Sequence, residues 1–97
     1  MKEIQFKWDA KKASENARKH GVSFEEASTA FYDEFARLLY DPDHSVNEDR
    51  FVLLGMSDRL RILVVCHCYR ERDSLIRIVS ARKATAKEQR FYREALS

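Results

Sequence analysis

The chain has 97 residues, of which 44% are hydrophobic, and its 18 basic and 16 acidic side chains leave a net charge of +2. This length suits one domain over residues 1–97, and the hydrophobic fraction is too high for a disordered chain. No apolar run resembles a signal peptide or reaches the roughly 20 residues that span a bilayer, so we expect a cytoplasmic protein without a membrane partner.

The charges are divided along the chain. Acidic residues dominate over residues 23–49 and basic residues over residues 50–93. A basic second half can form an anion-binding surface, and the simpler alternative is a pair of oppositely charged solvated faces. Cys66 and Cys68 are too close on one strand for an undistorted disulfide and too few for a metal site. We therefore expect buried thiols in a reducing compartment, with neither metal nor cofactor.

The N-terminal third predicts one short strand and two helices. Apolar residues alternate over residues 4–8, which is typical of a strand. Asp9 can cap a helix over residues 10–20, and Gly21 can end it in the left-handed conformation. We expect small side chains on the buried stripe of this helix: Ala13, Ala17 and Ala10. Ser23 and Glu26 fit a capping box that opens a second helix, which ends near residues 31–32.

The rest of the chain predicts four strands and a final helix. We expect strands at residues 36–40 and 51–56, separated by an acidic loop at residues 41–49. Residues 61–84 then form two strands rich in β-branched residues, joined by a turn at residues 70–73. Thr85 and Glu88 fit a second capping box, with a helix to about Leu96.

This order predicts an α+β fold. Consecutive strands joined by short turns form a four-stranded antiparallel meander, to which the short N-terminal strand is added. Two N-terminal helices and one C-terminal helix must cover the faces of the sheet.

Five blocks of sequence, in order and over nearly the whole chain, resemble the BrnT toxins. These blocks are residues 6–9, 16–27, 41–45, 64–67 and 76–84. Two departures are visible: Ala10 stands where the family often has proline, and Leu60 where it often has glycine. The resemblance implies a RelE-like fold and a type II toxin that cleaves RNA, inhibits translation and slows growth. It also implies neutralisation by a DNA-binding antitoxin that represses its own operon, in a toxin–antitoxin hetero-oligomer.

Metal-independent RNA cleavage needs a base for the 2′-hydroxyl, cations for the charge on the phosphate and an acid for the leaving oxygen. His67 is the only histidine within a predicted strand, and it is the candidate base. Arg61, Arg77 and Arg82 are the candidate catalytic cations, because a guanidinium binds phosphate oxygens in pairs. Further candidates for RNA binding lie outside this group: Lys19, His20 and Lys83.

The register of the last two strands decides whether these groups meet. An odd-length turn at residues 71–73 places His67 directly opposite Arg77, and this is the register that we expect. Arg82 then lies on the other face unless a bulge redirects it. An even-length turn places Arg77 opposite Cys66 instead.

Each candidate also has a purely structural interpretation. His67 can be a satisfied core histidine, and Arg77 can pair with a helix carboxylate such as Glu15. Arg82 and Lys83 can be ordinary surface charges, and Lys19 and His20 can simply end a helix. Two other residues fit local roles, His44 in its acidic loop and Tyr92 in docking the last helix.

The alternative functions are a non-catalytic nucleic-acid-binding module, with salt-sensitive binding but no strand scission, and a protein-interaction domain.

Overall fold

The computed structural model describes residues 3–70 and 74–96. The secondary structure begins with β1 (Gln5–Lys7), α1 (Ala10–His20), α2 (Phe24–Thr29) and the 3₁₀ turn η1 (Ala30–Tyr32). It continues with β2 (Arg37–Tyr40), the 3₁₀ turn η2 (Pro42–His44), β3 (Phe51–Met56), β4 (Ile62–Arg70), β5 (Leu75–Lys83) and α3 (Ala86–Glu94). The predicted order of elements is confirmed, and η1 carries the second helix to its expected end.

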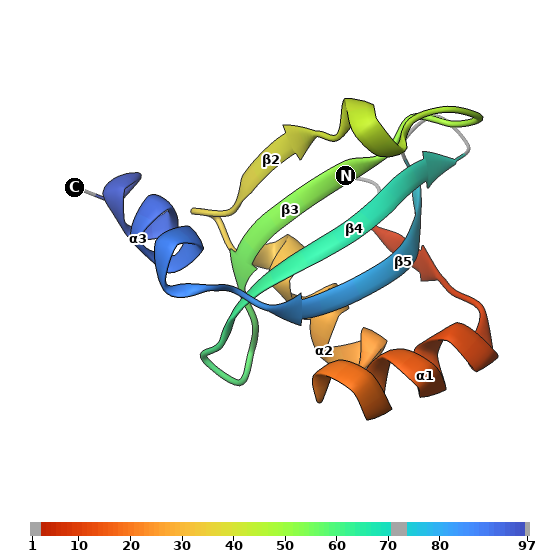
Figure 1. Ribbon diagram of the computed structural model, residues 1–97, viewed down its shortest axis with the longest axis horizontal. Helices are drawn as coiled ribbons and strands as arrows, with labels where there is room; N and C mark the ends of the chain where they lie inside the picture. The colour runs from red at the N-terminus through yellow and green to blue at the C-terminus, as the bar shows by residue number, and fades with distance from the viewer. Residues whose placement is uncertain (1–2, 71–73, 97) are drawn as a thin grey trace.

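The five strands form one sheet in the order β1-β5-β4-β3-β2. The predicted antiparallel meander from β2 to β5 is confirmed. β1 pairs in parallel with the first three residues of β5, so the sheet is mixed. The helices α1 and α2 separate β1 from the meander in sequence, and they lie together on one side of the sheet (Figure 1).

Each face of the sheet has its own core. Under α1 and α2 the buried side chains come from these helices and from alternate positions of the central strands, including Phe24, Ala27, Leu63, Val65 and Ile78. On the opposite face, α3 inserts Tyr92 beside Leu54, Ile62 and Val64. Figure 1 shows α3 at the end of the sheet where β5 finishes. α3 covers only part of this face. We call the part that α3 leaves uncovered the open face.

Side-chain caps begin the three helices as the sequence predicts. Asp9 accepts a hydrogen bond from Lys12 N at 2.9 Å, and Ser23 accepts one from Glu26 N at 3.0 Å. Thr85 and Glu88 form the complete reciprocal capping box. Glu26 does not complete the corresponding box at α2, because its carboxylate binds Arg61 instead.

The buried residue of α1 is Asn16, not an alanine, while Ala10 and Ala17 are exposed. β1 pairs only with the start of β5, which leaves the backbone of Ala81 without a strand partner on that side. The Asn16 amide takes that place: it donates to Ala81 O at 2.8 Å and accepts from Ala81 N at 3.1 Å. The same amide donates to Val22 O at 3.0 Å, so one polar side chain joins α1 to the sheet.

A β-bulge changes the register between β4 and β5. Cys66 pairs with Ser80, but the next residue, His67, pairs with Ile78, so Val79 is an extra residue on β5. Arg77 pairs with Cys68. The prediction that Arg77 lies opposite His67 is therefore wrong, and the turn at residues 71–73 on which it was based lies outside the described residues.

Within the described ranges, no helix is both long enough and apolar enough to cross a membrane.

Candidate active site on the open face of the sheet

The bulge brings Arg77 and Arg82 to the same face. These residues are five positions apart, so a regular strand would point them to opposite faces. The extra residue restores the alternation: Arg77 pairs with Cys68 and Arg82 with Val64, and both partners lie on the open face. Ser80, paired with Cys66, lies between them. The open face thus carries two of the three predicted catalytic arginines.

A cavity of about 360 Å³ opens beside Arg82. It is lined by Cys66 and Ser80 from the strands β4 and β5, by Tyr40 at the end of β2, and by Asp41 and His44 from the chain that connects β2 to β3. A smaller hollow of about 160 Å³ shares Asp41, His44, Cys66 and Ser80 and adds Arg50. Guanidinium, imidazole, thiol and hydroxyl groups therefore line adjoining hollows on one face.

His44 is the exposed histidine of this site. Pro42 starts the turn η2, and the turn places His44 Nδ1 2.8 Å from Asp41 Oδ2. The Ser45 hydroxyl fixes the same turn by donating to Asp41 O at 2.6 Å. A carboxylate that accepts from Nδ1–H leaves Nε2 free to accept a proton, and 70% of the His44 side chain is exposed. This Asp–His pair has the geometry of an oriented general base.

Arg82 is held by Glu88 at the start of α3. Its two terminal nitrogens donate to the two carboxylate oxygens at 2.8 and 2.9 Å. This bidentate pair, together with the hydrogen bond from Thr85 N, lowers the pKa of Glu88 to about 2 although burial opposes ionisation. Glu88 is therefore ionised at neutral pH, and it fixes the Arg82 guanidinium at the edge of the cavity.

Arg77 is held by Glu48, which belongs to the loop before β3 and not to a helix. Arg77 donates to one Glu48 oxygen, and Arg70 donates to the other at 2.6 Å. Arg50 lies 3.7 Å from the same carboxylate. Burial raises the pKa of Glu48, but the charges of the three arginines outweigh it and the net shift is downward. The partner of Arg77 in the structure is therefore Glu48, and not Glu15 as the sequence suggests.

His67 lies on the other face, beneath the helices, and its side chain is completely buried. Its ring packs edge-on against Phe31, with 4.7 Å between the ring centroids. Nδ1 donates to Val65 O at 3.0 Å, so Nε2 is the acceptor for the Tyr69 hydroxyl at 3.2 Å. Burial lowers the pKa of His67, and the ring is neutral. The structure therefore gives His67 the geometry of a satisfied core histidine, without direct access to RNA.

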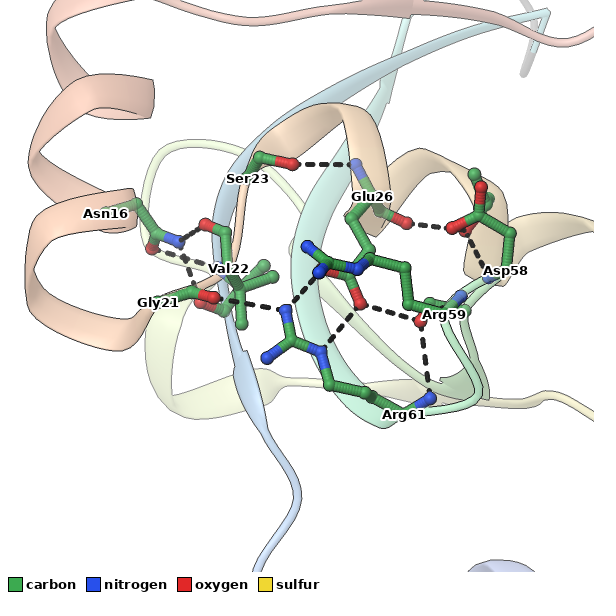
Figure 2. Close-up of polar contacts among 11 residues, drawn as sticks. Asn16, Gly21, Val22, Ser23, Glu26, Asp58, Arg59 and Arg61 are labelled. Atoms are coloured by element: carbon green, nitrogen blue, oxygen red, sulfur yellow. Dashed lines mark hydrogen bonds and ion pairs between the residues drawn. The ribbon is translucent and has the colours of Figure 1, made fainter.

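Arg61 lies on the same face as His67, as expected, but six residues away, which is roughly 20 Å along a strand. Figure 2 shows the network that holds it: Arg61 Nε donates to Glu26 Oε2 at 2.9 Å and a terminal nitrogen donates to Gly21 O at 3.0 Å. Ser57 donates to the same Glu26 carboxylate at 2.7 Å. The hydrogen bond from Arg61 lowers the pKa of Glu26. The expectation that Arg61 converges with His67 on one site is wrong.

The three residues predicted to bind RNA are dispersed. Lys19 and His20 are exposed in the last turn of α1, on the side of the sheet opposite the open face. Lys83 is exposed at the end of β5, where it lines a hollow of about 220 Å³ with Arg61 and Arg93. Of the three, only Lys83 lies next in sequence to a residue of the open face.

Sequence reasoning missed His44 as a site residue and missed Glu48 and Arg50 altogether. A signal was present for His44, since Asp41-Pro42-Asp43-His44 starts a proline-led turn that can bring Asp41 and His44 together. No local signal connects Glu48 with Arg77, because the two are 29 positions apart and meet only through the fold. In residues 3–70 and 74–96, no group of three or more His, Cys, Asp or Glu side chains could hold a metal ion.

The sequence matches a family model over residues 8–88, from the residue before the cap of α1 to Glu88. That model describes BrnT, the ribonuclease toxin of type II toxin–antitoxin systems. A search of the curated proteins finds no significant match. Among solved structures, the fold is similar to that of the Brucella abortus ribonuclease toxin BrnT, with a TM-score of 0.64 and 21% sequence identity. The similarity covers 84% of this chain and 97% of that one.

Proposed function

Since this chain belongs to the BrnT family of ribonuclease toxins of type II toxin–antitoxin systems, we propose that it cleaves RNA on the open face without a metal ion. Its partners are accordingly an RNA target and an antitoxin. We place the reaction in the cavity between His44 and Arg82. The observation that supports this choice is that His44 and Asp41 line the same cavity as Arg82 and Ser80.

The proposed reaction uses the 2′-hydroxyl of the RNA as nucleophile. His44 Nε2 removes its proton, while Asp41 holds the opposite side of the ring and stabilises the imidazolium that forms. The 2′-oxygen attacks the adjacent phosphorus, and the bond from phosphorus to the 5′-oxygen breaks. Arg82 stabilises the negative charge that builds on the phosphate oxygens, and the leaving 5′-oxygen takes a proton from solvent. The products are a 2′,3′-cyclic phosphate and a 5′-hydroxyl end.

The other predicted site residues receive different roles in this proposal. Arg77 contacts RNA on the open face. Lys83 follows Arg82 in sequence but pairs with Leu63 of the other face, so it lies beside this RNA path and not on it. We propose that His67 and Arg61 stabilise the fold, because the first is buried and the second is bound to Glu26 and Gly21. Lys19 and His20 lie on the side of α1, away from this RNA path.

We further propose that residues 1–97 act as one toxin domain in the cytoplasm, where RNA cleavage inhibits translation. The proposed antitoxin binds DNA, represses its own operon and forms a hetero-oligomer with the toxin. The type II family membership supports an antitoxin partner, and these finer properties can be tested by co-expression with the product of a neighbouring gene.

A cleavage assay on a ribo-oligonucleotide in excess EDTA tests the proposed function. We expect unchanged cleavage in EDTA, and we expect His44→Ala to lower the rate about 100-fold or more, as for loss of a general base. The other two histidines provide matched controls. His20→Ala should leave the rate unchanged, and His67→Gln should lower stability while retaining most of the activity of the folded fraction.

Three results would contradict this proposal. Loss of all cleavage in EDTA, with recovery on adding Mg²⁺, would show that the reaction depends on metal. Full activity in His44→Ala, together with loss of activity in a folded His67→Gln variant, would move the base to His67. RNA binding without any scission would favour the non-catalytic binding module.

A further inference from the structure

A second anion-binding feature lies on the open face, beyond the cavity that contains His44. One carboxylate, Glu48, faces three guanidinium groups: Arg77 and Arg70 donate to its two oxygens, and Arg50 lies 3.7 Å away. The cluster carries three positive charges and one negative charge. Three cations held together by a single carboxylate leave an excess of two positive charges for a larger anion.

One donor in this cluster has no partner. Arg77 Nε is buried and makes no hydrogen bond to any residue that the structure describes. A buried guanidinium nitrogen without an acceptor costs free energy, and in a functional site such a group calls for an explanation. A phosphodiester has two bridging oxygens besides its two non-bridging ones, so it offers this donor an acceptor that a carboxylate lacks.

The cluster adjoins the proposed active site. Arg77 shares the open face with Ser80 and Arg82, and Arg50 lines the hollow that also contains His44. A phosphodiester presents two non-bridging oxygens, and guanidinium groups bind these in the same paired way as they bind a carboxylate. Glu48 thus presents to the three arginines a pair of oxygens like the pair that a phosphodiester would present.

We propose that Arg50, Arg70 and Arg77 form a phosphate subsite for the RNA backbone, and that Glu48 occupies this subsite until RNA displaces it. This inference rests on the proposed function, because the ligand is the RNA of the same open face. Glu48 belongs to the irregular chain between η2 and β3, so its displacement leaves every pair of the sheet intact. The carboxylate keeps the arginines positioned in the free toxin and competes with RNA for them.

Equilibrium binding of a single-stranded RNA with 2′-O-methyl riboses tests the subsite. This RNA lacks the nucleophilic 2′-hydroxyl, so affinity is measured without cleavage. Glu48→Gln should bind it about fivefold more tightly than the wild type, and the salt dependence should steepen by about 0.7 for each added phosphate contact. Asp43→Asn is the matched control, since it removes the same charge from an exposed position of the same acidic segment. Adding Arg70→Gln to Glu48→Gln should abolish the gain.

Three outcomes would overturn the subsite. The first is an affinity of Glu48→Gln equal to that of Asp43→Asn, and the second is an affinity below that of the wild type. The third is a gain that persists after Arg70→Gln, which would reflect general charge.

Circular dichroism melting establishes that each variant is folded. Absence of RNA cleavage by the wild type would contradict the proposed function and not the subsite. The two results are distinguishable because cleavage of unmodified RNA is measured independently of binding. If Glu48→Gln instead tightens only binding of the antitoxin, the subsite binds protein carboxylates and not phosphate.

Discussion

Two histidines of this chain lie in different environments, since His44 is exposed and His67 is buried. His44 and His67 each hold one ring nitrogen against an oxygen, at 2.8 and 3.0 Å. The partner of His44 is a carboxylate at an exposed turn, which holds Nδ1 and leaves Nε2 facing solvent. The partners of His67 are a carbonyl and a phenol in an aromatic pocket, which suit a neutral ring. The location of His67 within a strand favours it as the base when only the sequence is considered. The exposure of the His44 side chain to solvent favours His44 once the structure is considered.

Burial of His67 makes the stability of the protein depend on pH. Its pKa is lowered in the folded state, so the unfolded chain binds a proton first as the pH falls below 6.5. We expect the free energy of unfolding to decrease by at most about 2 kcal/mol between pH 6.5 and pH 5. Urea denaturation at several pH values measures this change.

The control for this prediction is His67→Gln. This variant should be less stable than the wild type at pH 7.5, but its stability should change little between pH 6.5 and pH 5. Four carboxylates have a lowered pKa: Glu26, Asp33, Glu48 and Glu88. They lose most of their stabilising contribution below their ordinary pKa values of 3.8 for aspartate and 4.5 for glutamate, so they do not obscure this window. A wild type whose stability is constant from pH 6.5 to pH 5 would contradict a neutral, buried His67.

At the scale of elements, two of the residues that the structure describes have left-handed backbone, and one of the two is not glycine. Gly21 has φ +67° at the end of α1, and Leu60 has φ +61° in the turn before β4. A side chain with a Cβ is strained in this region. We expect Leu60→Gly to raise the free energy of unfolding by about 1 kcal/mol, since Leu60 is 79% exposed and loses little packing.

Gly21→Ala is the matched control with the opposite sign. A Cβ at Gly21 would meet no atom within 4 Å, so the expected loss of about 1 kcal/mol comes from the backbone alone. Thermal and urea unfolding of the two variants check both changes. A loss of stability in Leu60→Gly would show that the Leu60 side chain, and not its backbone, stabilises this turn.

Local signals in the sequence predict most elements correctly. Asp9, Ser23 and Thr85 were identified as caps because a cap depends on the residues of one turn. The bulge at Val79 and the partner of Asn16 could not be found in this way, since both depend on a neighbouring strand or helix. One unpredicted extra residue was enough to change which residues share a face with His67.

At the scale of the whole molecule, the fold was more predictable than the site. The order of β2 to β5 follows from short connections between consecutive strands. The site combines β4, β5, η2 and the loop before β3, and its ion pairs join residues up to 29 positions apart. The division of charge along the sequence indicated two solvated faces or an anion-binding surface. In the fold, Glu48 of the acidic half binds arginines of the basic half.

The central position of β4 predicts a gradient of stability across the sheet. β4 pairs with β3 over residues 62–67 and with β5 over residues 63–70, whereas β2 pairs with β3 alone and exposes Leu38 and Tyr40. We expect backbone amides of Leu63 and Val65 to exchange with deuterium most slowly and those of β2 faster. Native-state hydrogen exchange followed by mass spectrometry checks this order. Equal protection of β2 and β4 would imply that the sheet opens only as a unit.

The extra residue in β5 also affects how the gene can vary. Loss of the Val79 codon would remove the extra residue and leave Arg77 and Arg82 four positions apart. A regular strand would then keep both arginines on the open face and keep Ile78 and Ala81 in their core. Loss of a codon within β4, which has no extra residue, would instead turn the residues on one side of the deletion to the opposite face of the sheet. Among inherited changes, we therefore expect single-codon deletions in β4 to inactivate the toxin more often than deletion of Val79 does.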